Sequence, residues 1–186
     1  IDMHEEMADL TLDIILTTMF GSMLTKEENR QIAIAMKDIS EFAMQKPNQP
    51  IDIPTWVPIP QNFKLKRARR ILDEVILKLI KHRESSDDVH HDLLSMLMNA
   101  RSEEGEGLSS ERIRDQMATF IFAGQETTAT HLSWTWMLLA QHPKVLGKLQ
   151  EELRLVLGGR TPTVQDLPSL NYTRMVLEES LRVYPV

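Results

Sequence analysis

The sequence predicts an all-α protein, on three observations. Only 7 of its 186 residues are glycine, apolar residues recur at spacings of three and four, and the alternation typical of β-strands is rare. With 42% hydrophobic and 26% charged residues, the composition is that of a globular chain long enough to bury one hydrophobic core. We therefore expect a packed helical domain, or a part cut from a larger one.

Capping and breaking residues delimit two helices near the start of the sequence. The first is expected from about Asp2 to Met19, because Asp2 and Glu5 have the spacing of a capping pair. One face of this helix would carry Met3, Met7, Leu10 and Ile14. The second helix is expected from Lys26 to Gln45, and Pro47 ends it. Its apolar stripe would consist of Ile32, Met36, Ile39 and Ala43.

A proline-rich loop and two further helices follow. Five prolines lie from Pro47 to Pro60, which predicts an extended loop with apolar side chains to bury, because proline disrupts a helix interior. A third helix is expected from about Asn62 to Glu84, with its Lys and Arg side chains in solvent. Its inward positions would be Ala68, Leu72, Val75 and Leu79. A short fourth helix is expected from Asp92 to Ala100.

The longest predicted helix follows a polar linker from Ser102 to Gly107. Ser109, with Glu111 after it, is a signal for a helix start. No proline occurs between Ser109 and His142, so about 30 residues can form one helix, against a usual length of ~11 to 12. We expect this helix to pass through the centre of the domain.

Two helices are predicted after the long one. Pro143 favours the start of the first, and Gly158 with Gly159 favours its end. The second is expected from about Asn171 to Tyr184. Its apolar positions would be Met175, Val176, Leu177 and Leu181.

One turn of the long helix differs from a plain core helix. Phe120, Ala123, Gly124 and Thr127 share a face at helical spacing, and the small Ala and Gly would let a flat group approach the backbone. Glu126 lies beside them as a titratable proton source. A carboxylate next to a hydroxyl in an otherwise apolar helix is what proton delivery to a buried oxygen species needs.

A packing explanation exists for each of these residues taken singly. Ala123 and Gly124 would permit a tight helix crossing, Thr127 would hydrogen-bond to a backbone carbonyl in the core, and Glu126 would be solvated. Isolated buried threonines and helix glycines are common, so this reading is favoured for any one residue. The combination of all four favours the chemical reading.

The last helix contains a second pattern, Glu179 and Arg182, three residues apart on one face. If the two side chains are exposed, their ion pair contributes only ~0.2 to 0.5 kcal/mol, and a surface pair is the default interpretation. If they are buried, the arginine requires further partners for its donors.

Charge and cysteine content exclude several classes of protein. The formal net charge of -6 offers no basic surface for nucleic acid. The sequence has no cysteine, so disulfides, thiolate zinc sites and cysteine nucleophiles are excluded, and no set of metal ligands is predicted. No apolar stretch reaches the ~20 residues of a membrane span. The compartment stays open, with the cytoplasm as the working expectation.

Two motifs together resemble the cytochrome P-450 family of haem-thiolate monooxygenases. Ala123-Gly124-Gln125-Glu126-Thr127-Thr128 matches the family's oxygen-activation motif. Glu179-Ser180-Leu181-Arg182, with Pro185 after it, matches the family's Glu-x-x-Arg motif, and His142-Pro143 lies between the two. Each motif alone is weak, but the two in this order and about 50 residues apart are a strong signal.

The resemblance implies a role for each residue of the first motif. Ala123 and Gly124 would lie against the haem, Thr127 would hold dioxygen and its water at the haem, and Glu126 would supply protons. Phe120 on the same helix is expected in the substrate pocket. Glu179 and Arg182 would brace the fold on the far side of the haem.

The resemblance also implies that residues 1–186 are an internal piece covering roughly helices E to K, the central part of the family fold. The N-terminal part and the cysteine that binds the haem iron would lie outside it, so this piece alone would be inactive. The expected partners are a small organic substrate, dioxygen and a redox partner, either a ferredoxin or a flavoprotein reductase, separate or fused. The alternative is a helical binding or scaffold domain without catalysis; a metal-dependent helical hydrolase lacks a ligand set.

Overall fold

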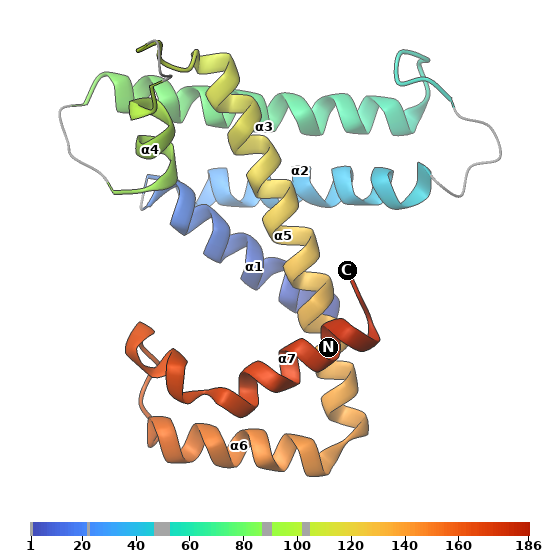
Figure 1. The fold of residues 1–186 in the computed structure, drawn as a ribbon. Helices are drawn as coiled ribbons and strands as arrows, with labels where there is room; N and C mark the ends of the chain where they lie inside the picture. The colour runs from blue at the N-terminus through green and yellow to red at the C-terminus, as the bar shows by residue number, and fades with distance from the viewer. Residues whose placement is uncertain (1, 22, 47–52, 87–90, 102–104) are drawn as a thin grey trace. The chain divides into compact units, whose positions relative to one another are not determined.

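The computed structural model describes residues 2–21, 23–46, 53–86, 91–101 and 105–186. Within these ranges every regular element is helical, and the one β-type pairing is an isolated bridge between Arg101 and Gly107. The elements are α1 (Met3–Phe20), α2 (Lys26–Gln45), α3 (Pro60–Glu84), α4 (Leu93–Asn99), α5 (Ser110–Gln141), α6 (Pro143–Leu157), η2 (Val164–Ser169) and α7 (Asn171–Val183) (Figure 1). The prediction of an all-α protein is therefore confirmed.

The helix boundaries agree with the capping residues in the sequence. Asp2 accepts hydrogen bonds from the backbone N–H groups of His4 and Glu5, at 2.9 and 3.3 Å, and so caps α1. Ser109 does the same for α5 through the N–H of Arg112, at 3.3 Å. Gly158 ends α6 with a φ of 58°, a left-handed conformation that glycine adopts without a steric penalty.

The chain divides into two compact units, one of residues 9–126 and the other of residues 1–8 and 127–186. The chain passes from one unit to the other twice, between Ala8 and Asp9 inside α1 and between Glu126 and Thr127 inside α5. We call them the 9–126 unit and the 127–186 unit.

The 9–126 unit contains the larger hydrophobic core. In it α2 and α3 run side by side in opposite directions (Figure 1). The inward positions predicted for the third helix are buried in this core, and so are three residues of α5 spaced four apart: Ile113, Met117 and Ile121. The basic residues of α3 between Lys64 and Arg70 are exposed, as predicted.

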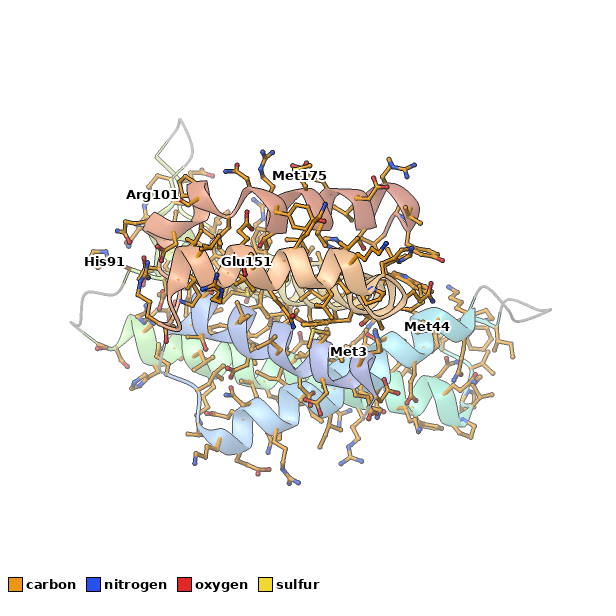
Figure 2. All side chains as sticks on the ribbon, turned by 90° about the horizontal axis from the view of Figure 1, so that it is seen from below. Met3, Met44, His91, Arg101, Glu151 and Met175 are labelled. Carbon is orange, nitrogen blue, oxygen red and sulfur yellow. The ribbon has the colours of Figure 1, made fainter. Side chains whose placement is uncertain are left out.

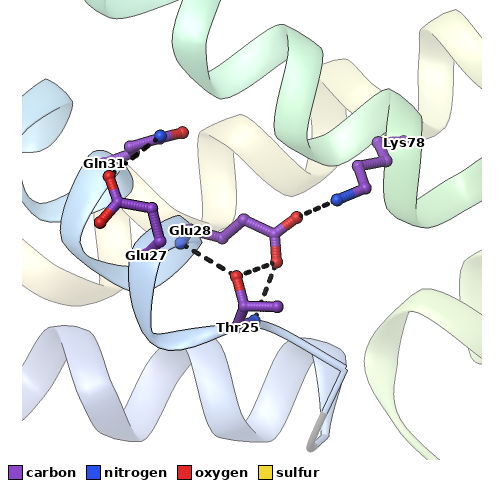
Figure 3. A network of polar contacts seen from close by, with 5 residues as sticks. All are labelled: Thr25, Glu27, Glu28, Gln31 and Lys78. Carbon is purple, nitrogen blue, oxygen red and sulfur yellow. Dashed lines mark hydrogen bonds and ion pairs between the residues drawn. The ribbon is translucent and has the colours of Figure 1, made fainter.

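A polar network joins the start of α2 to α3 (Figure 3). Thr25 and Glu28 form a capping box, in which the Glu28 N–H donates to Thr25 Oγ1 and the Thr25 N–H donates to Glu28 Oε2. Lys78 Nζ of α3 donates to Glu28 Oε1 at 2.6 Å. The hydrogen bond from Lys78 and those from Thr25 outweigh burial and lower the pKa of Glu28 to about 2.

The 127–186 unit is held together by α6, η2 and α7. Glu152 of α6 accepts hydrogen bonds from the backbone N–H groups of Tyr172 and Thr173, at 2.6 and 2.8 Å, and from the Thr173 hydroxyl. Burial of Glu152 opposes its ionisation, but these bonds together hold the pKa of the carboxyl below its ordinary value. Glu152 thereby caps α7, which has no capping side chain of its own.

Three features of these elements differ from what the sequence pattern indicates. The face of the first helix that carries Met3, Leu10 and Ile14 is exposed, and the buried residues of α1 are instead Thr11, Leu12, Leu16, Met19 and Phe20. Met175 of α7 is likewise exposed; Met3 and Met175 are labelled in Figure 2. Pro60 is the first residue of α3 and not the last of the loop, because proline fits the first helical turn. Residues 47–52 of the predicted loop and 102–104 of the predicted linker lie outside the described residues.

None of the helices in the described ranges combines the length and the apolar character that crossing a membrane requires.

Candidate functional site

The first part of α5 has a buried face and an exposed face. Ile113, Met117, Ile121 and Gln125 follow one another at intervals of four residues and are buried. Phe120 and Phe122 are 40% and 37% exposed, and Ala123 is also exposed. Phe120 and Ala123 lie on the face that was predicted to meet a flat group. The core of the 9–126 unit thus does not cover this face.

Gly124 lies where α1 approaches α5. A Cβ atom placed on Gly124 would overlap Ile15 Cδ1, so the absence of a side chain permits the close crossing. Beside it, the buried Thr11 hydroxyl of α1 donates to the backbone carbonyl of Gln125 at 3.3 Å. The packing explanation therefore accounts for Gly124, and its contact with a cofactor stays a prediction.

Glu126 has a partner that the sequence did not suggest. Ser40 Oγ of α2 donates a hydrogen bond of 2.7 Å to Glu126 Oε2, and both residues are partly buried. The one available signal was the position of Ser40, four residues after Met36 and three before Ala43, which puts a hydroxyl in the predicted apolar stripe of α2. The sequence gives no means of pairing it with a residue 86 positions later.

A largely apolar cavity of about 1030 Å³ lies among α2, α3 and α5 within the 9–126 unit. Its walls include Met36, Ile39, Ala43, Leu72, Phe122 and Ala123. Charged side chains also line it, among them Arg114, which is paired with Asp73 and Asp115 at 3.5 and 2.6 Å. Phe122 and Ala123 thus line the cavity, whereas Phe120 lies outside its lining and its assignment to a substrate pocket stays a prediction.

Thr127 is the first α5 residue of the 127–186 unit, and it is exposed. In this unit α5 contacts α7 through buried hydroxyls, because Thr135 Oγ1 donates to Ser180 Oγ at 2.9 Å and both residues are buried. His131 Nε2 lies 3.1 Å from the carbonyl oxygen of Leu177. The Trp134 and Tyr184 rings stack with their centroids 4.4 Å apart.

Glu179 and Arg182 form the predicted pair, and it is exposed. Arg182 Nε and Nη2 each donate to the Glu179 carboxylate at 2.7 Å, while the side chains remain 71% exposed for Arg182 and 59% exposed for Glu179. The mutual hydrogen bonds lower the pKa of Glu179 and raise that of Arg182. The buried member of this stretch is Ser180, which the sequence did not single out. A bracing role for the pair stays a prediction.

Within the described ranges, no three His, Asp or Glu side chains gather in a group that could hold a metal ion.

Comparison with known proteins places this helical chain in a family. The family model of cytochrome P450 matches residues 1–186, and the chain belongs to the cytochrome P450 family. It is 35% identical to cyclooctat-9-en-7-ol 5-monooxygenase of Streptomyces melanosporofaciens over 186 residues, which is 100% of this chain and 40% of the relative. It is 32% identical to pentalenene oxygenase of Streptomyces avermitilis, covering 100% of this chain and 41% of the relative.

A solved structure has the same fold. Retinoic acid-bound cyanobacterial CYP120A1 superimposes with a TM-score of 0.79 at 24% identity, over 100% of this chain and 40% of that one. The chain therefore spans about 40% of the length of these relatives. The family assignment is consistent with the two motifs from which the resemblance was drawn.

The family implies haem, and the residues present fit one side of it. The exposed face of α5 at Phe120 and Ala123 offers an aromatic ring and a methyl group, which suit a flat apolar macrocycle. The sequence has no cysteine, so a thiolate ligand for the iron is not supplied by these residues. These residues therefore fit contact with one face of a haem, but they do not supply an axial ligand for its iron.

Proposed function

We propose that this chain is the oxygen-activation part of a haem-dependent monooxygenase. In the overall reaction a substrate C–H bond becomes C–OH with one atom of dioxygen, and the other atom leaves as water. Two electrons from a redox partner and two protons from solvent balance the reaction. The observation that carries the proposal is the family match over the whole chain, with the oxygen-activation motif on one turn of its longest helix.

Haem iron, when bound, would supply the binding and reduction of dioxygen. Ala123 would hold one face of the haem with its methyl group, and Gly124 beside it would contribute its backbone, since Ile15 occupies the space where a side chain of residue 124 would lie. The Thr127 hydroxyl would hold a water molecule near the bound oxygen. Glu126 would take protons from solvent and pass them toward that water. The partial exposure of Glu126 supports this role, because its carboxylate keeps access to solvent.

We also propose that residues 1–186 belong to a longer polypeptide that supplies a cysteine thiolate to the iron. Two observations support this. The relatives are about two and a half times as long, since the chain covers 40% of the first of them. Leu10, Ile14 and Trp136 are 48%, 55% and 43% exposed, and exposed apolar side chains on helices favour a further packing partner. Glu179 and Arg182 would become buried in such a protein and brace it.

The substrate is proposed to be a small, predominantly apolar organic molecule. The cavity beside Phe122 and Ala123 supports this, because its wall is mostly apolar and its volume of about 1030 Å³ is close to the upper limit of small-molecule sites. Two of the relatives are named for cyclooctat-9-en-7-ol and pentalenene, which gives two compounds to try first. Electrons would come from a ferredoxin or a flavoprotein reductase.

The decisive experiment is the absorbance spectrum of the reduced full-length protein under carbon monoxide, after expression with haem available. A strongly red-shifted Soret band, absent from a protein of residues 1–186 alone, is expected. A folded, haem-supplied full-length protein without this band would contradict the proposal and favour a non-catalytic helical scaffold. The same preparation, supplied with a reductase and either compound above, then tests for product by mass spectrometry.

A further inference from the structure

The hydrogen bond between Ser40 and Glu126 connects two helices that wall the same cavity. Ile39 and Ala43, on either side of Ser40 in α2, line the cavity. Phe122 and Ala123, in the turn of α5 before Glu126, line it as well. The 2.7 Å bond from Ser40 Oγ to Glu126 Oε2 therefore fixes the carboxylate to the helix opposite its own.

We propose that Ser40 is a positioning residue for proton transfer by Glu126. The inference rests on the proposed function and adds to it a residue outside both sequence motifs. Ser40 itself neither gives nor takes the transferred proton; it holds the carboxyl group of Glu126 in one orientation.

A hydroxyl suits this task better than a cation does. When Glu126 is ionised, Ser40 donates to it, as in the structure. When Glu126 is protonated, its O–H can donate to a lone pair of Ser40 Oγ, because a hydroxyl is both a donor and an acceptor. A lysine or arginine at this position would favour the ionised form alone. Ser40 therefore orients Glu126 in both of its protonation states.

Orientation matters because a glutamate side chain has three rotatable bonds, and proton transfer requires heavy-atom distances of about 2.6 to 3.2 Å. Without the bond to Ser40, the carboxyl group of Glu126 would spend time in rotamers that do not reach the next proton acceptor. Protons would then arrive less often at the productive site, and more of the reduced oxygen would leave as peroxide.

The test uses the full-length protein with four substitutions. Ser40→Val removes the hydroxyl, and Ser40→Thr keeps it in a side chain of the same shape, so the two differ in the hydrogen bond while perturbing packing alike. Glu126→Gln removes the titratable group, and Ser40→Val with Glu126→Gln combines the two. Ser85→Ala is the control, because the Ser85 hydroxyl donates to the backbone carbonyl of His82 at an exposed position and Ser85 does not line this cavity.

The first readout does not depend on activity. The infrared difference between wild type and Glu126→Gln gives the carboxylate band of Glu126. We expect this band to shift in Ser40→Val and to stay close to its wild-type position in Ser40→Thr and Ser85→Ala. An unshifted band in Ser40→Val would show that Ser40 does not form this hydrogen bond with Glu126, and it would overturn the proposal whether or not the protein proves to be a monooxygenase.

The second readout is the partition between product and peroxide. Product formed per electron pair should fall roughly 3- to 10-fold in Ser40→Val, a part of the ~10²- to 10⁴-fold that general acid–base catalysis contributes, and Ser40→Thr should recover most of it. Ser40→Val should cause no further loss in the presence of Glu126→Gln, because Ser40 acts through Glu126. Additive losses, or unchanged partition in an active Ser40→Val enzyme, would overturn the positioning role while leaving the proposed function intact.

Discussion

The guanidinium group of Arg83 at the end of α3 lies against the carboxylate of Asp92, the residue that caps α4. Arg83 Nη2 is 2.7 Å from Asp92 Oδ2 and Nη1 is 3.0 Å from Oδ1, and the two side chains are 5% and 8% exposed. Asp92 Oδ1 also accepts from the backbone N–H of Ser95 at 2.9 Å. Burial raises the pKa of Asp92, but the hydrogen bonds from Arg83 and Ser95 together hold it below its ordinary value.

Replacing one partner of this buried pair should be costly. We expect Arg83→Met to lower the free energy of unfolding by about 3 to 5 kcal/mol, because it leaves the Asp92 carboxylate buried without its cation. Urea denaturation of the full-length protein measures the change. Arg30→Met is the control, since Arg30 and Glu27 form an exposed pair, 70% and 59% exposed, and it should change stability by less than ~1 kcal/mol. Equal effects of the two substitutions would contradict the burial argument.

Acid should weaken the junction of α2 and α3 through Glu28. Its pKa is about 2 in the folded chain against 4.5 ordinarily, so its contribution is complete above about pH 4.5 and is lost as the pH falls toward 2. The loss should be on the order of 1 to 2 kcal/mol, less than the full shift implies, because Lys78 is 69% exposed.

Stability measured by urea denaturation from pH 6 to pH 2.5 checks this contribution. Glu28→Gln should reduce the pH dependence within that window and leave the slope above pH 5 unchanged. Glu27→Gln is the comparison: hydrogen bonds from Arg30 and Gln31 also lower the pKa of Glu27, but this carboxyl is exposed, so its removal should change the acid slope less. If Glu28→Gln left the acid slope as it is in wild type, the assignment to Glu28 would be wrong.

The effect of Gly124→Ala on stability should depend on Ile15. Alanine favours a helix over glycine by about 1 kcal/mol, but its Cβ would overlap Ile15 Cδ1, which costs ~1 to 3 kcal/mol unless the isoleucine moves. Ile15→Val removes Cδ1, so the double variant should be more stable than the sum of the single changes predicts, by about 1 kcal/mol.

Gly147→Ala in α6 is a matched control for the helix term, because a Cβ there has no neighbour within 4 Å. It should raise stability by up to ~1 kcal/mol. Thermal unfolding of the full-length variants measures the stability of each single and double variant. Strict additivity of Gly124→Ala and Ile15→Val would show that the close approach of Ile15 is not what constrains position 124.

Thr127→Ala in the complete protein should uncouple electron consumption from product formation. The substitution removes the hydroxyl proposed to hold water, so peroxide released per reducing equivalent should rise severalfold while haem content stays near wild type. Peroxide, product and reductant are measured together. Thr18→Ala removes an exposed hydroxyl bonded to the Ile14 carbonyl and should change none of them. Unchanged coupling in Thr127→Ala would count against its assigned role.

Arg182→Ala should lower the yield of folded, haem-loaded protein if Arg182 braces the longer polypeptide. Arg174→Ala is a close control, because Arg174 pairs with Glu178 on the same helix, and these side chains are 66% and 61% exposed. Haem content and the fraction of soluble protein are the measurements. Equal, small effects of the two substitutions would show that the Glu179–Arg182 pair is only a surface ion pair and does not brace the longer polypeptide.

The sequence by itself determined the helices, their approximate boundaries and the family. Capping, proline and glycine signals act within about four residues of themselves, so α2 was predicted with its observed bounds, and the long helix expected between Ser109 and His142 is observed as Ser110–Gln141. The motif around Glu126 and Thr127 and the motif from Glu179 to Arg182 are also local patterns, and the two together, in this order, point to the cytochrome P450 family.

Only the tertiary structure decided which faces are buried and which distant side chains meet. α1 has apolar residues around most of its circumference, so periodicity could not show that Leu12 and Leu16 are buried while Leu10 and Ile14 are exposed. Ser40 with Glu126 and Gly124 with Ile15 lie 86 and 109 positions apart. Such pairs depend on how whole helices pack, and no signal confined to one helical turn carries that information.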